Sequence, residues 1–176
     1  MMKGLKRRVI YALMIIVGFL LESMLFPHFA LASVTPNLLL IITASIGFMR
    51  GKQEGLFIGF FCGLLVDIFF GDYIGLYAML YTLIGYANGF FKRLFYDDDI
   101  KLPLALIAGS DLLYGLGIYF FLFMLNGDFR FLYYLQHIII PEMLYTVLVT
   151  LIFYYIILRV NQKLEAEEQR SASKFV

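Results

Sequence analysis

The chain has 176 residues and a formal net charge of +1, from 14 basic and 13 acidic side chains. Hydrophobic residues make up 62% of it and charged residues only 15%, whereas a soluble domain is usually near half apolar and about a quarter charged. The near-neutral charge provides no basic surface for nucleic acid, and the long apolar runs exclude an ordinary soluble domain, so we expect a small polytopic membrane protein.

Six apolar runs predict six transmembrane helices, because a helix of about 20 residues crosses the ~30 Å hydrocarbon core of a bilayer. An open sheet is excluded because it would leave unpaired backbone groups facing lipid. We expect one transmembrane domain, residues 1–165, and a polar cytoplasmic tail, residues 166–176. The expected spans are residues 9–26, 36–50, 54–70, 73–91, 102–125 and 138–160.

The first run follows KGLKRR and imitates a secretory signal, with Ala30 and Ala32 in an A-x-A cleavage site. A signal of this kind has an apolar region of about 7–15 residues. The run here is longer, and Glu22 interrupts it. We therefore expect an uncleaved first span, with cleavage of residues 1–32 as the alternative.

Basic residues predict the orientation. If the N-terminus is cytoplasmic, thirteen of the fourteen lysines and arginines lie on the cytoplasmic side and only Arg130 lies outside. Cytoplasmic loops of membrane proteins carry such an excess of basic residues. We therefore expect both termini to be cytoplasmic.

Glycines recur at every fourth position in the third and fourth runs. Residues four apart lie along one side of a helix, and helices in lipid associate through close backbone packing at small residues. We predict that this stripe packs helices within the bundle, with a pivot or a dimer face as the alternatives. The helix-packing glycines are Gly55, Gly59, Gly63, Gly85 and Gly89.

Acidic and amide side chains interrupt the apolar runs. Asp67 continues the glycine stripe, so we expect it to be protonated or hydrogen-bonded to a neighbouring helix, and we expect Asp72 to cap the fourth helix. Asp111 lies deeper in the fifth run. Polar residues within membrane spans are candidates for a functional site. In this chain they could line an outer polar cavity or contact a partner. The alternative is that they form hydrogen bonds between the helices of the bundle. The candidates at the outer level are Glu22, Asn37, Asp67 and Glu142.

Signals of catalysis are weak. The chain has no P-loop, dinucleotide fingerprint, H-E-x-x-H motif or nucleophile elbow. Its single cysteine, Cys62, has no partner for an intrachain disulfide, and no Cys/His cluster has metal-ligand spacing. We therefore expect no enzymatic activity, no catalytic residue, no metal site and no cofactor.

Residues 35–85 resemble the central signature of the MreD family of bacterial rod shape-determining proteins. The matching features are Thr35-Pro36-Asn37 followed by leucines, Arg50-Gly51, the stripe from Gly55 to Asp67, then Gly71 and Gly75-Leu76. The length and the six spans agree, so the resemblance covers about residues 5–165.

The resemblance implies a membrane scaffold of the cell-elongation (rod) complex in the bacterial cytoplasmic (inner) membrane, which organises or regulates lateral peptidoglycan synthesis and cell shape. Family members bind the bitopic protein MreC and, with it, the complex of RodA and a penicillin-binding protein. The family resembles in fold the substrate-binding subunits of energy-coupling-factor vitamin transporters, and no catalytic residue is implied.

Two other functions stay open at this point. A vitamin-type transporter subunit would use the four outer polar residues as ligand contacts. An intramembrane enzyme acting on a lipid-linked precursor rests only on the acidic residues among them.

Overall fold

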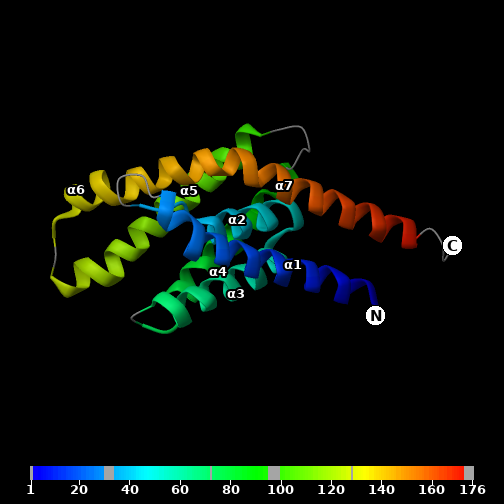
Figure 1. The fold of residues 1–176 in the computed structure, drawn as a ribbon, viewed down its shortest axis with the longest axis horizontal. Helices are drawn as coiled ribbons and strands as arrows, with labels where there is room; N and C mark the ends of the chain where they lie inside the picture. The colour runs from blue at the N-terminus through cyan, green and yellow to red at the C-terminus, as the bar shows by residue number, and fades with distance from the viewer. Residues whose placement is uncertain (1, 30–33, 72, 95–99, 128, 173–176) are drawn as a thin grey trace.

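The computed structural model describes residues 2–29, 34–71, 73–94, 100–127 and 129–172, and within them the chain is almost entirely helical (Figure 1). The α-helices are α1 (Met2–Leu20), α2 (Leu38–Arg50), α3 (Lys52–Phe70), α4 (Leu76–Asn88), α5 (Lys101–Ile118), α6 (Phe131–Tyr134) and α7 (Ile140–Ala172). Short π- or 3-10-helical turns prolong three of them: Leu21–Leu25 and Phe26–Phe29 follow α1, Gly89–Leu94 follows α4, and Tyr119–Phe123 and Met124–Asn126 follow α5. The π-helical turn Leu135–Ile139 lies between α6 and α7. Since α6 runs through a π-helical turn directly into α7, these elements form six rods. The all-helical prediction is confirmed, and six helices agree with the sequence pattern.

Four helical stretches are long and apolar enough to cross a membrane: Lys6–Phe29, Lys52–Phe70, Lys101–Asn126 and Phe131–Gln169. α2 is apolar but has only 13 residues, about 20 Å at 1.5 Å per residue, which is less than the ~30 Å hydrocarbon thickness. The structure therefore supports a multi-pass membrane protein, in which α2 is the short apolar helix.

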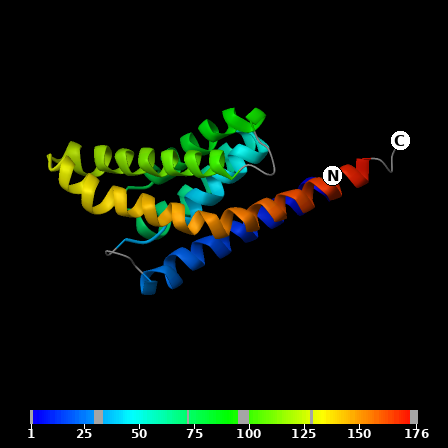
Figure 2. The same cartoon turned by 90° about the horizontal axis from the view of Figure 1, so that it is seen from above.

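The short helix α2 is the centre of the bundle. Every residue from Leu38 to Met49 is buried, and α2 contacts α1, α3, α4, α5 and α7 (Figure 2). A helix that is apolar on all sides is compatible either with burial in a bundle or with contact to lipid, and the structure shows that α2 is buried by its neighbours. Thr43 and Ser45 have small side chains and Gly47 has none, so neighbouring helices can approach the backbone of α2 closely.

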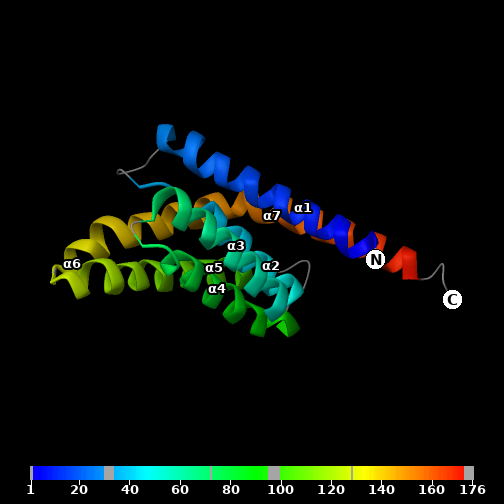
Figure 3. The ribbon, with the colours of Figure 1, turned by 90° about the horizontal axis from the view of Figure 1, so that it is seen from below.

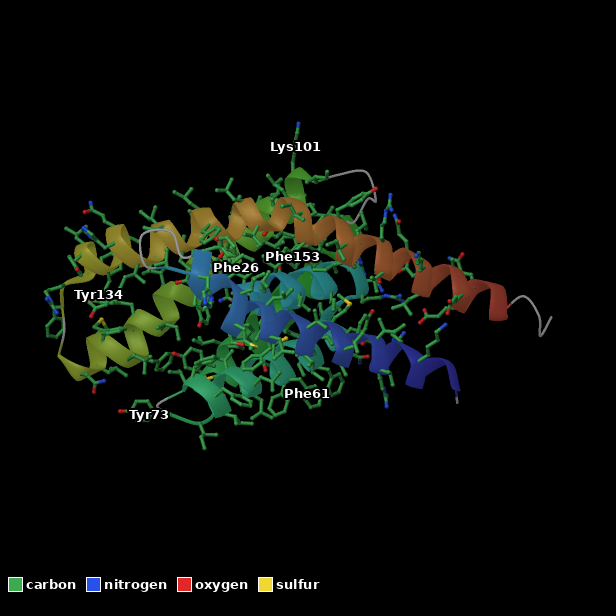
Figure 4. All side chains as sticks on the ribbon, in the orientation of Figure 1. Phe26, Phe61, Tyr73, Lys101, Tyr134 and Phe153 are labelled. Carbon is green, nitrogen blue, oxygen red and sulfur yellow. The ribbon has the colours of Figure 1, made fainter. Side chains whose placement is uncertain are left out.

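Both described ends of the chain lie at the same end of the bundle, where α1 begins and α7 ends (Figure 3). At the opposite end, the hairpin formed by α5, α6 and α7 reaches beyond the other helices (Figure 1). α1 lies along α7, and Phe26, just after α1, faces Phe153 of α7 with ring centroids 6.5 Å apart (Figure 4).

Candidate functional site

The glycines of α3 lie directly against the backbone of α4. A β-carbon added to Gly55 would overlap the carbonyl oxygen of Gly85, and one added to Gly59 would overlap that of Tyr81. Gly63 packs in the same way on the backbone of Tyr77 and Ala78. The groove along α3 is therefore filled by a helix of the same chain.

The glycines of α4 complete this contact. Gly85 lies on the carbonyl of Gly55, and Gly89, just after α4, lies on the backbone of Lys52 at the start of α3. Gly47 of α2 also approaches the carbonyl of Gly85. Three helices therefore meet at small residues, which is the packing that lipid-embedded helices favour.

Asp67 provides the hydrogen bonds at the start of α4. Its two carboxylate oxygens accept from the backbone N–H groups of Tyr77 and Ala78, at 2.9 Å each. The residue at the N-cap position is Gly75, whose φ of 104° is a left-handed conformation that suits glycine. Asp72 lies outside the described residues. Because a helix N-terminus carries partial positive charge, an acid is favourable at this otherwise apolar location.

Asn37 organises the start of α2. Its side-chain oxygen accepts from the N–H of Leu40 at 3.0 Å and from the hydroxyl of Tyr81 at 2.6 Å. Its backbone N–H donates to Oγ1 of Thr146 at 3.1 Å. Asn37 is only 3% exposed, so one buried amide connects α2 with α4 and α7.

Glu22 binds the same helix end from the π-helical turn that follows α1. Its Oε2 accepts from the N–H of Leu39 at 3.0 Å, next to the N–H of Leu40 that Asn37 satisfies. The first N–H groups of a helix have no partner within the helix. Side chains from two different segments therefore supply the partners that α2 needs inside the bundle.

Glu142 and Asp111 lie near this helix end on the other side. Glu142 is half-buried near the start of α7 and within electrostatic range of Asp111 and Glu22. Asp111, only 3% exposed, is hydrogen-bonded to Thr146, while its Oδ1 has no partner among the described residues. The structure thus gathers Glu22, Asn37 and Glu142 around the start of α2, whereas Asp67 lies at the start of α4.

A surface depression of about 360 Å³ lies on the first rod. Its lining is entirely apolar, from Val17, Leu20, Leu21, Met24 and Leu25. Among the described residues, no group of three or more His, Cys, Asp or Glu side chains is placed to hold a metal ion.

A charged network at the end where the chain begins was not predicted from the sequence. Arg7 of α1 bonds Glu54 of α3 at 2.7 Å and Glu168 of α7 at 3.2 Å. Arg50 of α2 bonds the same Glu168 at 3.0 Å and Asn161 at 2.5 Å. The part of the expected polar tail that the structure describes is therefore helical, and Glu167 and Glu168 bond it to the bundle. The signal in the sequence was the three-residue spacing of Glu165 and Glu168, which places both acids on one helix face.

Comparison with known proteins identifies one family. A family model described as rod shape-determining protein MreD matches residues 2–164. No curated protein and no solved structure matches the chain. The family match extends far beyond residues 35–85, on which the resemblance in the sequence rests.

Proposed function

Because the chain belongs to the MreD family of rod shape-determining proteins, as the match over residues 2–164 shows, we propose that it is a non-enzymatic scaffold of the bacterial cell-elongation complex. Membership of this family gives it a role in rod-shape determination. The partner that we propose is MreC, through which the scaffold reaches the complex of RodA and a penicillin-binding protein. In this role it organises or regulates lateral peptidoglycan synthesis from the cytoplasmic (inner) membrane.

Charge distribution supports an orientation with both termini in the cytoplasm. Lys6 and Arg7 at the start of the first span lie beside Glu167 and Glu168 near the end of α7. Arg50 and Lys52, between α2 and α3, belong to the same end of the bundle. Basic residues gathered at one end favour that end as the cytoplasmic one.

The observation that carries the scaffold proposal is the use of the outer polar groups inside the chain. Asn37 and Asp67 are 3% and 2% exposed and bond backbone N–H groups at the starts of α2 and α4. Glu22 bonds α2 in the same way. A ligand-binding subunit needs polar groups that converge on a space, whereas these three hold helices together. This arrangement favours a rigid scaffold over a vitamin-type transporter subunit.

Among the four outer polar residues, we propose Glu142 as the contact with a partner. It is half-buried and lies within the continuous rod formed by α6, Leu135–Ile139 and α7, so it does not sit at a free helix end. Glu142→Gln should reduce the amount of MreC that co-purifies with the tagged protein. Glu167→Gln, the same chemical change at an exposed position on the opposite end of α7, is the matched control and should leave co-purification unchanged. Equal recovery of MreC with both variants would remove Glu142 from the interface.

The function itself is tested by depleting the protein in its host and imaging cells over several generations. Rounding and swelling of rods, reversed by re-expression, is the expected result. If the cells instead keep their rod shape and show a growth defect that one added vitamin cures, the function is that of a vitamin-type transporter subunit and not that of a scaffold.

A further inference from the structure

α1 is the least buried of the four long apolar helices. Only 17% of its most apolar window is buried, compared with 28% for the stretch that contains α5, 33% for that of α7 and 39% for α3. Lipid tails are as apolar as the side chains they meet, so apolar surface gives helices little reason to associate in a membrane. Packing and polar contacts must therefore hold α1 in place.

The tight packing of α1 is limited to a few positions along one face. Tyr11 and Ile15 are 4% and 5% exposed, and Gly18 contacts the side chain of Ile42 on α2. Polar contacts lie at the two ends of the span, where Arg7 bonds α3 and α7 and Glu22 bonds α2.

One carboxylate joins the first, second and last helices. Oε1 of Glu168 accepts from Arg7 at 3.2 Å, and Oε2 accepts from Arg50 at 3.0 Å. The side chain of Arg50 is only 8% exposed and also bonds Asn161, which lies about two helical turns before Glu168 on α7. Without the Glu168 charge, Arg7 keeps its bond to Glu54 of α3 but loses its charge-assisted bond to α7, which weakens the attachment of α1.

We propose that residues 161–169 of α7 form a strap that locks α1 onto the other five helices, with Glu168 as the residue that closes it. Opening the strap releases the cytoplasmic half of α1 while the core of α2, α3 and α4 stays assembled, because glycine packing rather than charge holds that core together. The strap is thus a conformational device at the charged end of the protein.

Glu167 offers a control one residue away. It bonds Lys6 at 2.6 Å, but the two side chains are 55% and 60% exposed. Exposed ion pairs of this kind contribute little to stability. Glu167→Gln therefore makes the same chemical change as Glu168→Gln on the same helix while leaving the bridge between Arg7 and Arg50 intact.

The experiment measures distances between spin labels in the full chain, reconstituted in lipid nanodiscs and carrying Cys62→Ala. One pair of labels replaces Leu13 on α1 and Ile156 on α7, and a reference pair replaces Leu83 on α4 and Leu113 on α5; all four positions are exposed. Wild type and Glu167→Gln should give one distance for the first pair. Glu168→Gln should give a second, longer distance for this pair, from molecules in which α1 is released. The ratio of docked to released α1 should be about tenfold lower than in wild type, because one charge-assisted hydrogen bond is lost.

Two results would overturn the strap. One is a first-pair distribution in Glu168→Gln that matches Glu167→Gln. The other is a shift of the reference pair as well, because the carboxylate would then hold the whole bundle rather than α1. If Glu168→Gln fails to fold, Arg7→Gln leaves the bond between Arg50 and Glu168 but removes the bonds of α1 to both Glu168 and Glu54. Glu54→Gln, which removes only the bond to α3, is then measured beside it: a longer first-pair distance in Arg7→Gln alone supports the strap, and equal distributions in the two variants overturn it.

Discussion

The hydrogen bonds between Asp67 and the start of α4 make a quantitative prediction for Asp67→Leu. The carboxylate is 2% exposed and accepts from two backbone N–H groups, those of Tyr77 and Ala78. Leucine has the same number of side-chain heavy atoms in the same branched arrangement but no acceptor, so both N–H groups lose the carboxylate as their hydrogen-bond acceptor. A buried donor without a partner costs about 1–3 kcal/mol, and we therefore expect about 4 kcal/mol of destabilisation in total.

The assay is thermal unfolding of the purified protein in detergent, followed by the loss of monomeric protein on size-exclusion chromatography. In a chain of this length, 1 kcal/mol shifts Tm by about 2–4 °C, so Asp67→Leu should lower Tm by about 8–16 °C. Glu167→Leu is the matched control, because it removes an acid whose side chain is 55% exposed, and it should change Tm by less than about 2 °C. Equal shifts for the two variants would refute the assignment of Asp67 as the group that holds the start of α4.

Three other changes test the packing and the buried amide by the same assay. Gly55→Ala places a β-carbon against the carbonyl of Gly85 and should lower Tm by several degrees. Gly109→Ala is the control, because nothing lies within 4 Å of the added β-carbon, and it should leave Tm unchanged or raise it slightly. Equal Tm shifts for the two variants would contradict the close approach of α3 and α4. Asn37→Ala removes the acceptor for Leu40 and Tyr81 and should lower Tm by about 4–8 °C. Tyr81→Phe should lower it by about 2–4 °C in wild type and by clearly less beside Asn37→Ala, because the hydroxyl has then already lost its acceptor; additive losses would show that the two side chains act independently.

The helical, membrane-embedded character of the chain was determined locally. Long apolar runs dictate helices in lipid because each helix satisfies its own backbone hydrogen bonds. The four-residue spacing of Gly55, Gly59 and Gly63 likewise depends only on helix geometry. Both properties can be predicted without knowing which segments contact one another, so the sequence alone was sufficient for them.

The partners of the polar side chains were decided by the tertiary structure. Asp67 was recognisable as an acid that needed a neighbour, but an outer cavity and a helix end were equally compatible with its position in the sequence. The bond of Asn37 to Thr146 joins residues 109 apart, and that of Arg50 to Glu168 joins residues 118 apart.

The charged network shows the limit most clearly. A run of acids near the C-terminus resembles a solvated tail when it is considered alone, because charged side chains are usually exposed. Only the packing of α7 along α1 and α2 places Glu168 between Arg7 and Arg50. Residue types determine what a segment needs, but the crossing of distant helices determines which side chain supplies it.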